Sequence, residues 1–174
     1  MFRGINVGGK AALPMAELTK LLEACGYTGI KTYIQSGNVV FRSSKTEADK
    51  LPERIGKAVS SRHGFRPEAI VLGVGEIERA VVSNPFPEAE AEPKSLHLYF
   101  LERSPPNPNL EAMSALKAAS ESFATVDKVF YLHAPDGFGR SKLAARAEKL
   151  IGVGATARNW RTVNKILELA KASE

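Results

Sequence analysis

The sequence predicts an α+β fold with two small antiparallel sheets and helices packed on them. Short runs of alternating or β-branched apolar residues are separated by segments in which apolar residues recur every three or four positions. The first half of the chain gives the order β-α-β-β-α-β, and the second half repeats that order approximately. A stretch rich in proline and glutamate separates the two halves. We therefore expect two ferredoxin-like subdomains.

The first half begins with a short apolar strand and a helix. The strand is expected at residues 5–7, and the helix has apolar residues at helical spacing up to Cys25. Pro14 suits the first helical position because its missing N–H would be unpaired there, and Gly26 suits the position after the last turn. Cys25 therefore belongs to the core, and a lone cysteine excludes an internal disulfide and fits a reducing cytoplasm.

A β-hairpin is predicted around Gly37-Asn38, because both residues tolerate the positive φ angles of a tight turn. A two-residue turn would pair Ser36 with Val39. Asn38 is then interpreted as a turn residue, and a ligand contact is considered for Ser36. The other elements expected in this half are a helix over 46–63, a strand over 69–72 and a short helix over 76–82.

The predicted domain organisation is a first subdomain over 1–84, a linker over 85–94 and a second subdomain over 95–174 that includes a C-terminal helix. The second subdomain is modified at its C-terminal end, where its last strand is weak or replaced by residues 154–157. Its other expected elements are a strand over 96–100, a helix over 110–119 capped by Asn109, a strand over 128–133, a helix over 141–150 and a final helix over 158–171.

Composition limits the possible functions. The chain has 174 residues, of which 44% are apolar and 25% charged, as in soluble globular proteins. It has no apolar run of about 20 residues and no visible signal peptide, so we expect a cytoplasmic protein without a membrane partner. The net charge is +5, and residues 137–165 hold seven Lys/Arg against one acid. This concentration fits either a surface that meets an anion or a solvated, salt-bridged helical face.

Residues 4–10 have the glycine and lysine spacing of a Walker A phosphate loop but depart from it. Ala11 stands where the pattern requires a Ser or Thr hydroxyl for Mg²⁺. Pro14 places the helix start beyond Lys10, whereas a phosphate loop needs its helix to begin at the lysine. We therefore disfavour a nucleoside triphosphatase. Two interpretations of Gly8-Gly9-Lys10 stay open, a small anion-binding nest beside a lysine and a tight strand-to-helix turn.

The final helix is expected to have an apolar side and a basic side. Trp160 is interpreted as a core anchor, with stacking on a nucleic-acid base as the alternative. Arg158, Arg161 and Lys165 would form a basic stripe from a helix N-terminus, where the dipole also favours anions. Residues 139–142 offer a second basic helix start, with Ser141 as the N-cap.

No familiar catalytic or metal-binding constellation is found. The three histidines are isolated and lack ligand spacing, so we expect no metal site and no cofactor. His97 alternates with apolar strand positions and is interpreted as a hydrogen-bonded residue of the sheet face rather than a base. An RNA-recognition module is disfavoured because the strands lack its aromatic spacing.

Four segments together resemble the bacterial family known as domain of unknown function 1697. They are residues 3–10, 33–41, 139–143 and 156–163. The resemblance runs over essentially the whole chain and implies a pair of ferredoxin-like subdomains without an established activity. It also favours a ligand role for the motif residues Asn6 and Lys10. Family members usually carry more apolar residues ahead of Arg3, which predicts either a short first strand or a truncated start here.

These observations lead to the hypothesis of a binding protein for an anionic ligand: a nucleotide, a nucleic acid or a phosphorylated metabolite. The predicted site lies at the face between the subdomains. The alternatives are a phosphotransferase or hydrolase whose general base is not identified, and an interaction scaffold. Catalytic residues and oligomeric state are left open. The predicted ligand-binding residues are Arg3, Asn6, Gly8, Gly9, Lys10, Ser36, Lys142, Arg158, Asn159 and Arg161.

Overall fold

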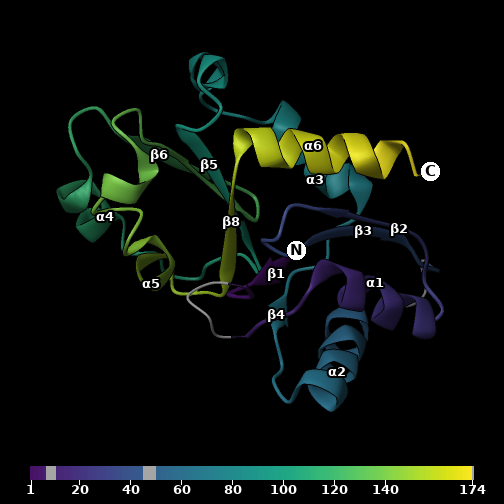
Figure 1. Cartoon of the computed structure of the whole chain (residues 1–174). Helices are drawn as coiled ribbons and strands as arrows, with labels where there is room; N and C mark the ends of the chain where they lie inside the picture. The colour runs from purple at the N-terminus through teal and green to yellow at the C-terminus, as the bar shows by residue number, and fades with distance from the viewer. Residues whose placement is uncertain (7–10, 45–49, 174) are drawn as a thin grey trace. The chain divides into compact units, whose positions relative to one another are not determined.

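The computed structural model describes residues 1–6, 11–44 and 50–173, and its helices and small antiparallel sheets confirm the α+β class (Figure 1). Two compact units can be distinguished. The first unit is Met1–Val74 with Lys165–Glu174, and the second unit is Gly75–Asn164. None of the described helices is both long enough and apolar enough to span a bilayer.

The first unit follows the order β-α-β-β-α-β, but its strands form two separate two-stranded sheets, β1-β4 and β2-β3. Phe2 pairs with Ala69 in the first sheet, and its N–H donates to the Gly37 carbonyl at 2.8 Å. The elements are β1 (Phe2–Arg3), α1 (Met15–Ala24), β2 (Thr28–Tyr33), β3 (Asn38–Arg42), α2 (Leu51–His63) and β4 (Glu68–Ala69).

The expected first strand at residues 5–7 is wrong. The strand β1 ends at Arg3, because Gly4 and Asn6 adopt positive φ angles of 65° and 56° and turn the chain. Ile5 is instead a buried residue of the turn, 2% exposed, and Val7 lies outside the described residues. The apolar pattern therefore identified a core residue correctly but not its secondary structure.

The β2–β3 hairpin has a different turn from the predicted one. Tyr33 pairs with Asn38, so residues 34–37 form the turn and the expected pairing of Ser36 with Val39 is wrong. Asn38 is a buried strand residue and not an exposed turn residue. Its Nδ2 donates to the Tyr33 carbonyl at 3.2 Å and to Ser36 Oγ at 3.0 Å. A side-chain amide thus closes the longer turn.

The core of the first unit lies where α1 and α2 pack on the strands (Figure 1). Cys25 is partly buried against this core, and Gly26 ends α1 with a φ of 88°, as expected for the position after a helix. The buried residues include Phe2, Ile5, Leu18, Leu22, Ile55 and Val59.

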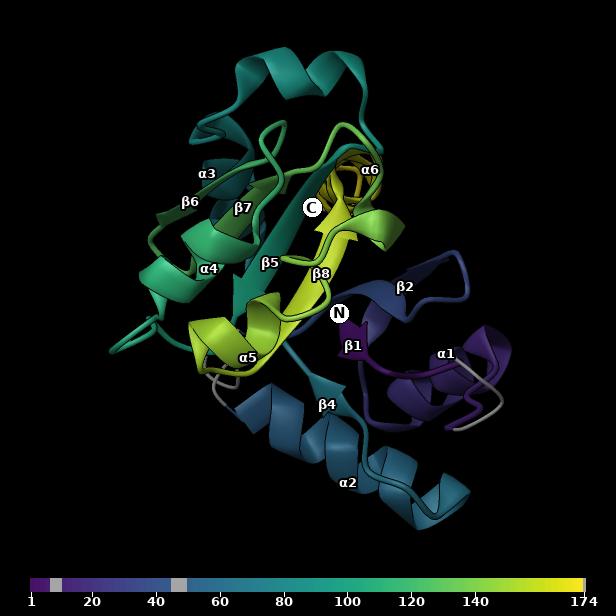
Figure 2. The same cartoon turned by 90° about the vertical axis from the view of Figure 1, so that its left-hand side faces the viewer.

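The second unit contains a four-stranded antiparallel sheet in the order β6-β7-β5-β8 (Figure 2). The strands are β5 (Leu96–Leu101), β6 (Ser122–Val126), β7 (Val129–His133) and β8 (Ala155–Asn159). The sequence reasoning did not assign β6, which joins β7 through a turn at Asp127 with a φ of 52°. Aspartate tolerates this left-handed conformation better than most residues do.

Helices cover both faces of this sheet. The helices α4 (Leu110–Leu116) and α5 (Ala147–Ile151) lie over one face, where Leu101, Phe130 and Leu132 are buried (Figure 2). On the other face, Tyr131 Oη donates to the Ala80 carbonyl of α3 (Val74–Val82) at 2.7 Å. Asn109 caps α4 as predicted, because its side chain accepts the Ala112 N–H at 3.0 Å.

Several further segments differ in detail from the sequence expectations, including β4, which ends at Ala69 and not at residue 72. Residues 85–94 contain the 3-10 helix η2 (Pro87–Ala91), with Ala89 only 2% exposed. Residues 142–146 form turns before α5 begins, although Ser141 Oγ does accept the Ala144 N–H at 2.9 Å. The final helix α6 (Trp160–Lys171) begins two residues later than expected, because residues up to Asn159 pair with β5.

The end of α6 belongs to the first unit and is held there by two cations of the β2–β3 hairpin. Lys31 Nζ donates to the Ala172 carbonyl at 3.3 Å, and Arg42 Nε donates to the Ser173 carbonyl. The last carbonyls of a helix have no partner within it, so such cations stabilise its C-terminus.

Along the whole chain, the strands and α-helices contain the order β-α-β-β-α-β twice. That the two halves form a pair of ferredoxin-like subdomains stays a prediction.

Candidate functional site

The structure distributes the predicted site residues over both units. Arg3, Asn6 and Ser36 belong to the first unit. Gly8, Gly9 and Lys10 lie outside the described residues, so the predicted nest has no structural description. The remaining predicted residues, all in the second unit, are Lys142, Arg158, Asn159 and Arg161.

In the first unit, Arg3 forms an ion pair across a strand. Arg3 and Glu68 lie directly opposite each other in the β1–β4 ladder, and the Arg3 guanidinium donates to the Glu68 carboxylate. Opposite charges facing each other across two strands stabilise their pairing. The geometry thus gives Arg3 a structural contact.

The side chain of Asn6 is fully engaged with the backbone. Its Oδ1 accepts the Leu13 N–H at 2.7 Å, while Nδ2 donates to the carbonyls of Leu13 and Gln35, both at 2.9 Å. These bonds use both amide protons and join three chain segments. A short amide side chain is also among those that best tolerate the positive φ of Asn6. The needs of the fold alone therefore account for an asparagine at this position of the motif.

In the second unit, two of the predicted basic residues, Arg158 and Arg161, lie where β8 ends and α6 begins. Arg158 is a strand residue opposite Leu98, so the expectation that it forms a helical stripe with Arg161 and Lys165 is wrong. The reason is that Ala155–Asn159 pairs with β5. Trp160, the first residue of α6, is 6% exposed and confirms the core interpretation.

The guanidinium of Arg158 is half-buried and held in place by neighbouring groups. Its Nη1 donates to Thr156 Oγ1 at 3.0 Å and to the Ala157 carbonyl at 2.7 Å. Burial lowers the pKa of Arg158 to about 10, because the charged form loses hydration. The group still carries its charge at neutral pH, so the second unit holds a desolvated cation at the end of β8.

Asn159 and Arg161 have different positions around this junction. Asn159 Oδ1 accepts the Thr162 N–H at 2.9 Å and so caps α6. Arg161 is exposed on the first turn of the helix. Lys142 is exposed in the turns that follow the 3-10 helix η3 (Phe138–Arg140).

A histidine contacts η3 and also pairs with the strand residue just before α6. The sequence alone did not predict this arrangement. The His97 ring stacks on Phe138 with centroids 3.6 Å apart, and His97 lies opposite Asn159 in the ladder. Strand alternation therefore puts His97 and Asn159 on one face of the sheet and Arg158 on the other. The alternating pattern around His97 predicted its strand position but gave no signal of the stacked ring.

The environment of His97 favours its neutral form. Burial lowers the pKa of His97 to about 4, and the backbone of Ser95 opposes this shift only in part. Its Nδ1 is buried without a hydrogen bond of ordinary geometry among the described residues, so the expectation of a hydrogen-bonded histidine is wrong at this atom. A neutral imidazole can accept a proton, but Phe138 covers this ring and Arg158 lies on the opposite face.

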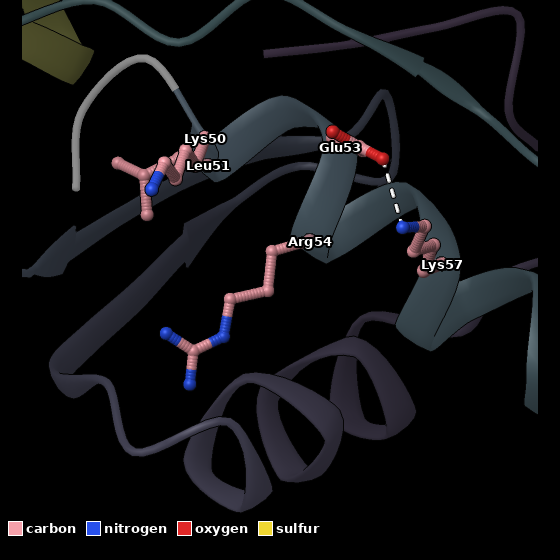
Figure 3. A pocket seen from close by; sticks show the side chains of 5 residues that line it. All are labelled: Lys50, Leu51, Glu53, Arg54 and Lys57. Atoms are coloured by element: carbon pink, nitrogen blue, oxygen red, sulfur yellow. Dashed lines mark ion pairs between the residues drawn. The ribbon is translucent and has the colours of Figure 1, made fainter.

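A hollow in the first unit contains none of the predicted residues. It has a volume of about 320 Å³ and is lined by one side of the first turns of α2 (Figure 3). The lining residues are Lys50, Leu51, Glu53, Arg54 and Lys57. The sequence does contain a signal for it, because three of these residues are cations spaced i, i+4 and i+7, which is one face of a helix.

Within the described residues, no group of three or more His, Cys, Asp or Glu side chains has a geometry that could hold a metal ion. The described side chains at the second-unit junction and in the hollow include cations and hydrogen-bond donors. Both can recognise phosphate or carboxylate groups.

Comparisons with known proteins identify relatives without a known activity. The family model described as protein of unknown function (DUF1697) matches residues 1–131. A search of the curated proteins found no match. Among solved structures, a conserved bacterial protein from Streptococcus pneumoniae is similar, with a TM-score of 0.69 and 22% identity over 98% of this chain and 96% of that one. At this identity the likeness concerns the fold.

Proposed function

We propose that the chain, which belongs to the DUF1697 family of proteins of unknown function, binds an anionic ligand at Arg158 of the second unit. The proposed ligand is a nucleotide, a nucleic acid or a phosphorylated metabolite. One observation carries the proposal. The Arg158 guanidinium is half-buried and keeps its charge although burial lowers its pKa to about 10. An anion that reaches this guanidinium is attracted more strongly than at a fully exposed arginine, because water screens the two charges less where the group is partly buried.

The surroundings of Arg158 support an anion more than a neutral ligand. The contacts with Thr156 Oγ1 and the Ala157 carbonyl orient the planar guanidinium before a ligand arrives. A fixed guanidinium donates two parallel hydrogen bonds to a phosphate or carboxylate, which a lysine cannot reproduce. Arg161 adds an exposed positive charge three residues further along the chain.

A thermal-shift screen with ATP, AMP, glucose 6-phosphate and a short single-stranded RNA tests this proposal. A ligand at about 100 times its Kd stabilises the native state by about 2.7 kcal/mol, which raises Tm by several degrees. We expect Arg158→Gln to lose this rise and Arg158→Lys to regain only part of it. Arg146→Gln is the matched control, because Arg146 is an exposed arginine of the same unit.

Two outcomes of the screen would contradict the proposal. A flat response of the wild type to all four compounds contradicts the proposal, as does an equal response of the Arg158→Gln variant. If the RNA is the ligand that responds, its affinity must fall steeply as salt rises from about 50 to 200 mM, because phosphate contacts release counterions.

A further inference from the structure

The strand β6 is an edge strand without the features that usually protect such edges. It is the last strand of the second-unit sheet, so one of its sides pairs with β7 and the other side with no strand of the described chain (Figure 2). The segment Ser122–Val126 has no charged residue, no proline and no break in its register with β7. Exposed edges of this kind tend to pair with other strands, and proteins normally block them with charges, prolines or bulges.

By contrast, the edge strands β2, β4 and β8 carry protection of this kind. β2 contains Lys31 and an irregular register between Thr28 and Lys31. β4 has two residues, one of which is Glu68, and β8 contains Arg158. Short length, charges and bulges all hinder the addition of a further strand. Their absence from β6 indicates that this edge is paired in the working protein.

The outward backbone groups of β6 can be assigned from the hydrogen bonds of β7. The Leu101 N–H donates to the Lys128 carbonyl at 2.9 Å, so the backbone groups of Lys128 point toward β5. Backbone groups of successive residues point to opposite sides of a strand, so the odd-numbered residues of β7 face β6. Their partners in β6 are its even-numbered residues. The N–H and C=O groups of Phe123 and Thr125 therefore point outward, away from β7.

A second copy of β6 satisfies these outward groups in one register. About a two-fold axis at Ala124, perpendicular to the sheet, Phe123 of each copy lies opposite Thr125 of the other copy. Each such pair exchanges both of its N–H···O=C bonds, as hydrogen-bonded antiparallel pairs do. All the outward groups of these residues then have partners. A shift by two residues would instead place Asp127 or Glu121, which lie outside the strand, opposite one of them.

The side chains of β6 also fit this pairing. Phe123 is half-buried and stacks on Phe130 with ring centroids 5.7 Å apart, while Thr125 is exposed. An aromatic residue opposite a β-branched residue is a favourable cross-strand pair. The flanking acids Glu121 and Asp127 lie opposite each other beyond the strand ends. Glu121 is only 4% exposed, however, and its carboxylate already accepts a backbone N–H of its own chain at 2.9 Å.

We propose that two copies of this chain pair through β6, antiparallel and about this two-fold axis. The two four-stranded sheets then form one continuous sheet. A two-fold interface is self-complementary and closes after two copies, so it occupies the edge without forming a filament. The strand β8 with Arg158 is the opposite edge of the sheet. The dimer is therefore independent of the function proposed at Arg158.

Sedimentation velocity of the full chain between about 10 and 500 µM tests the proposal, since small interfaces associate weakly. We expect the average mass to rise from that of a monomer toward that of a dimer. A monomer at every concentration overturns the proposal and leaves this edge to an extended segment of another protein.

Amide hydrogen exchange of the ¹⁵N-labelled full chain, measured by NMR over the same concentrations, locates the contact. The amides of Phe123 and Thr125 should exchange about threefold or more slowly at the highest concentration, because pairing protects them. The amide of Ala124, which faces β7, should be protected at both ends of the range. Equal exchange of Phe123 and Thr125 at all concentrations overturns the proposal, because any dimer then forms elsewhere.

Two substitutions at Thr125 complete the test. Thr125→Pro removes the outward N–H but keeps the hydrogen bonds with β7, since an edge strand tolerates proline on its outer side. Thr125→Lys keeps the backbone and adds a charge to the edge. We expect each to weaken dimerisation at least about tenfold. Thr32→Lys is the matched control, because Thr32 is an exposed threonine of β2 in the first unit. Dimerisation of the folded Thr125 variants as strong as that of the control overturns the proposal.

Discussion

Asn6 in the first unit and Arg158 in the second were both predicted as ligand-binding residues, yet their polar groups are used differently. The Asn6 amide makes three hydrogen bonds to backbone groups that need partners. The Arg158 guanidinium instead accepts a loss of hydration that lowers its pKa. The first arrangement stabilises the fold, whereas the second leaves a partly dehydrated charge that an anion can contact. A polar residue selected from the sequence can therefore be a folding requirement or a binding group, and only the contacts distinguish them.

The largest effect is expected at Asn6. Asn6→Ala removes three hydrogen bonds and places a Cβ-bearing residue without a compensating side chain at a φ of 56°. At about 1 kcal/mol for each of the three hydrogen bonds and about 1 kcal/mol for the left-handed conformation, we expect a loss of about 4 kcal/mol in the free energy of unfolding. Urea denaturation of the full chain measures it.

Asn6→Gly is the matched control, because glycine adopts the positive φ without strain but makes no side-chain hydrogen bond. Its loss should be smaller than that of the alanine variant by about 1 kcal/mol. If Asn6→Ala unfolds at the same urea concentration as the wild type, Asn6 is not the folding residue that its contacts indicate, and a ligand role returns.

The second expected effect concerns the pH dependence of the second unit. The pKa of His97 is lowered to about 4 by burial, whereas in the unfolded chain it is near 6.5. The unfolded state therefore binds the proton first, and stability falls as the pH drops from about 6.5 to 4. We expect His97 to contribute on the order of 2 kcal/mol to this loss.

Urea midpoints of the wild type, His97→Gln and His133→Gln between pH 7 and 4.5 measure this contribution. The slope should flatten for His97→Gln and persist for His133→Gln, which removes a histidine of β7 whose ring lies 6.3 Å from that of Phe86, against 3.6 Å between the rings of His97 and Phe138. Identical slopes in all three proteins would show that the His97 ring is hydrated in solution and that Phe138 does not hold it in place.

The comparison also shows what the sequence could predict. Periodicity located α1, α2 and β5, and capping residues such as Asn109 fixed helix starts, because these signals are local. Positive φ angles escaped the sequence pattern at Asn6, where a turn replaced the expected strand, and at Asp127, where a turn joins β7 to the unpredicted strand β6. The start of α6 was misplaced because pairing with β5, a contact distant in sequence, extended β8 to Asn159.

The candidate sites were harder to predict than the fold. Arg158 was selected for a helical stripe that does not exist, and it keeps a place in the proposal because the sheet partly buries its guanidinium. The hollow beside α2 was overlooked, although Lys50, Arg54 and Lys57 share a helical face in the sequence. Burial and enclosure depend on tertiary packing, so they cannot be predicted from the local pattern of a single sequence.

The smallest expected effect is the most informative about Arg158. Arg158→Met keeps much of the side-chain volume, removes the desolvated charge and gives up the hydrogen bonds to Thr156 Oγ1 and the Ala157 carbonyl. Replacing a buried charge by an apolar side chain of similar size is often neutral or stabilising. We expect the free energy of unfolding to change by less than about 1 kcal/mol. Urea denaturation without ligand, beside Arg146→Met as the exposed control, measures this change. A loss as large as that of Asn6→Ala would make Arg158 a folding residue, and the two motifs would then share one role.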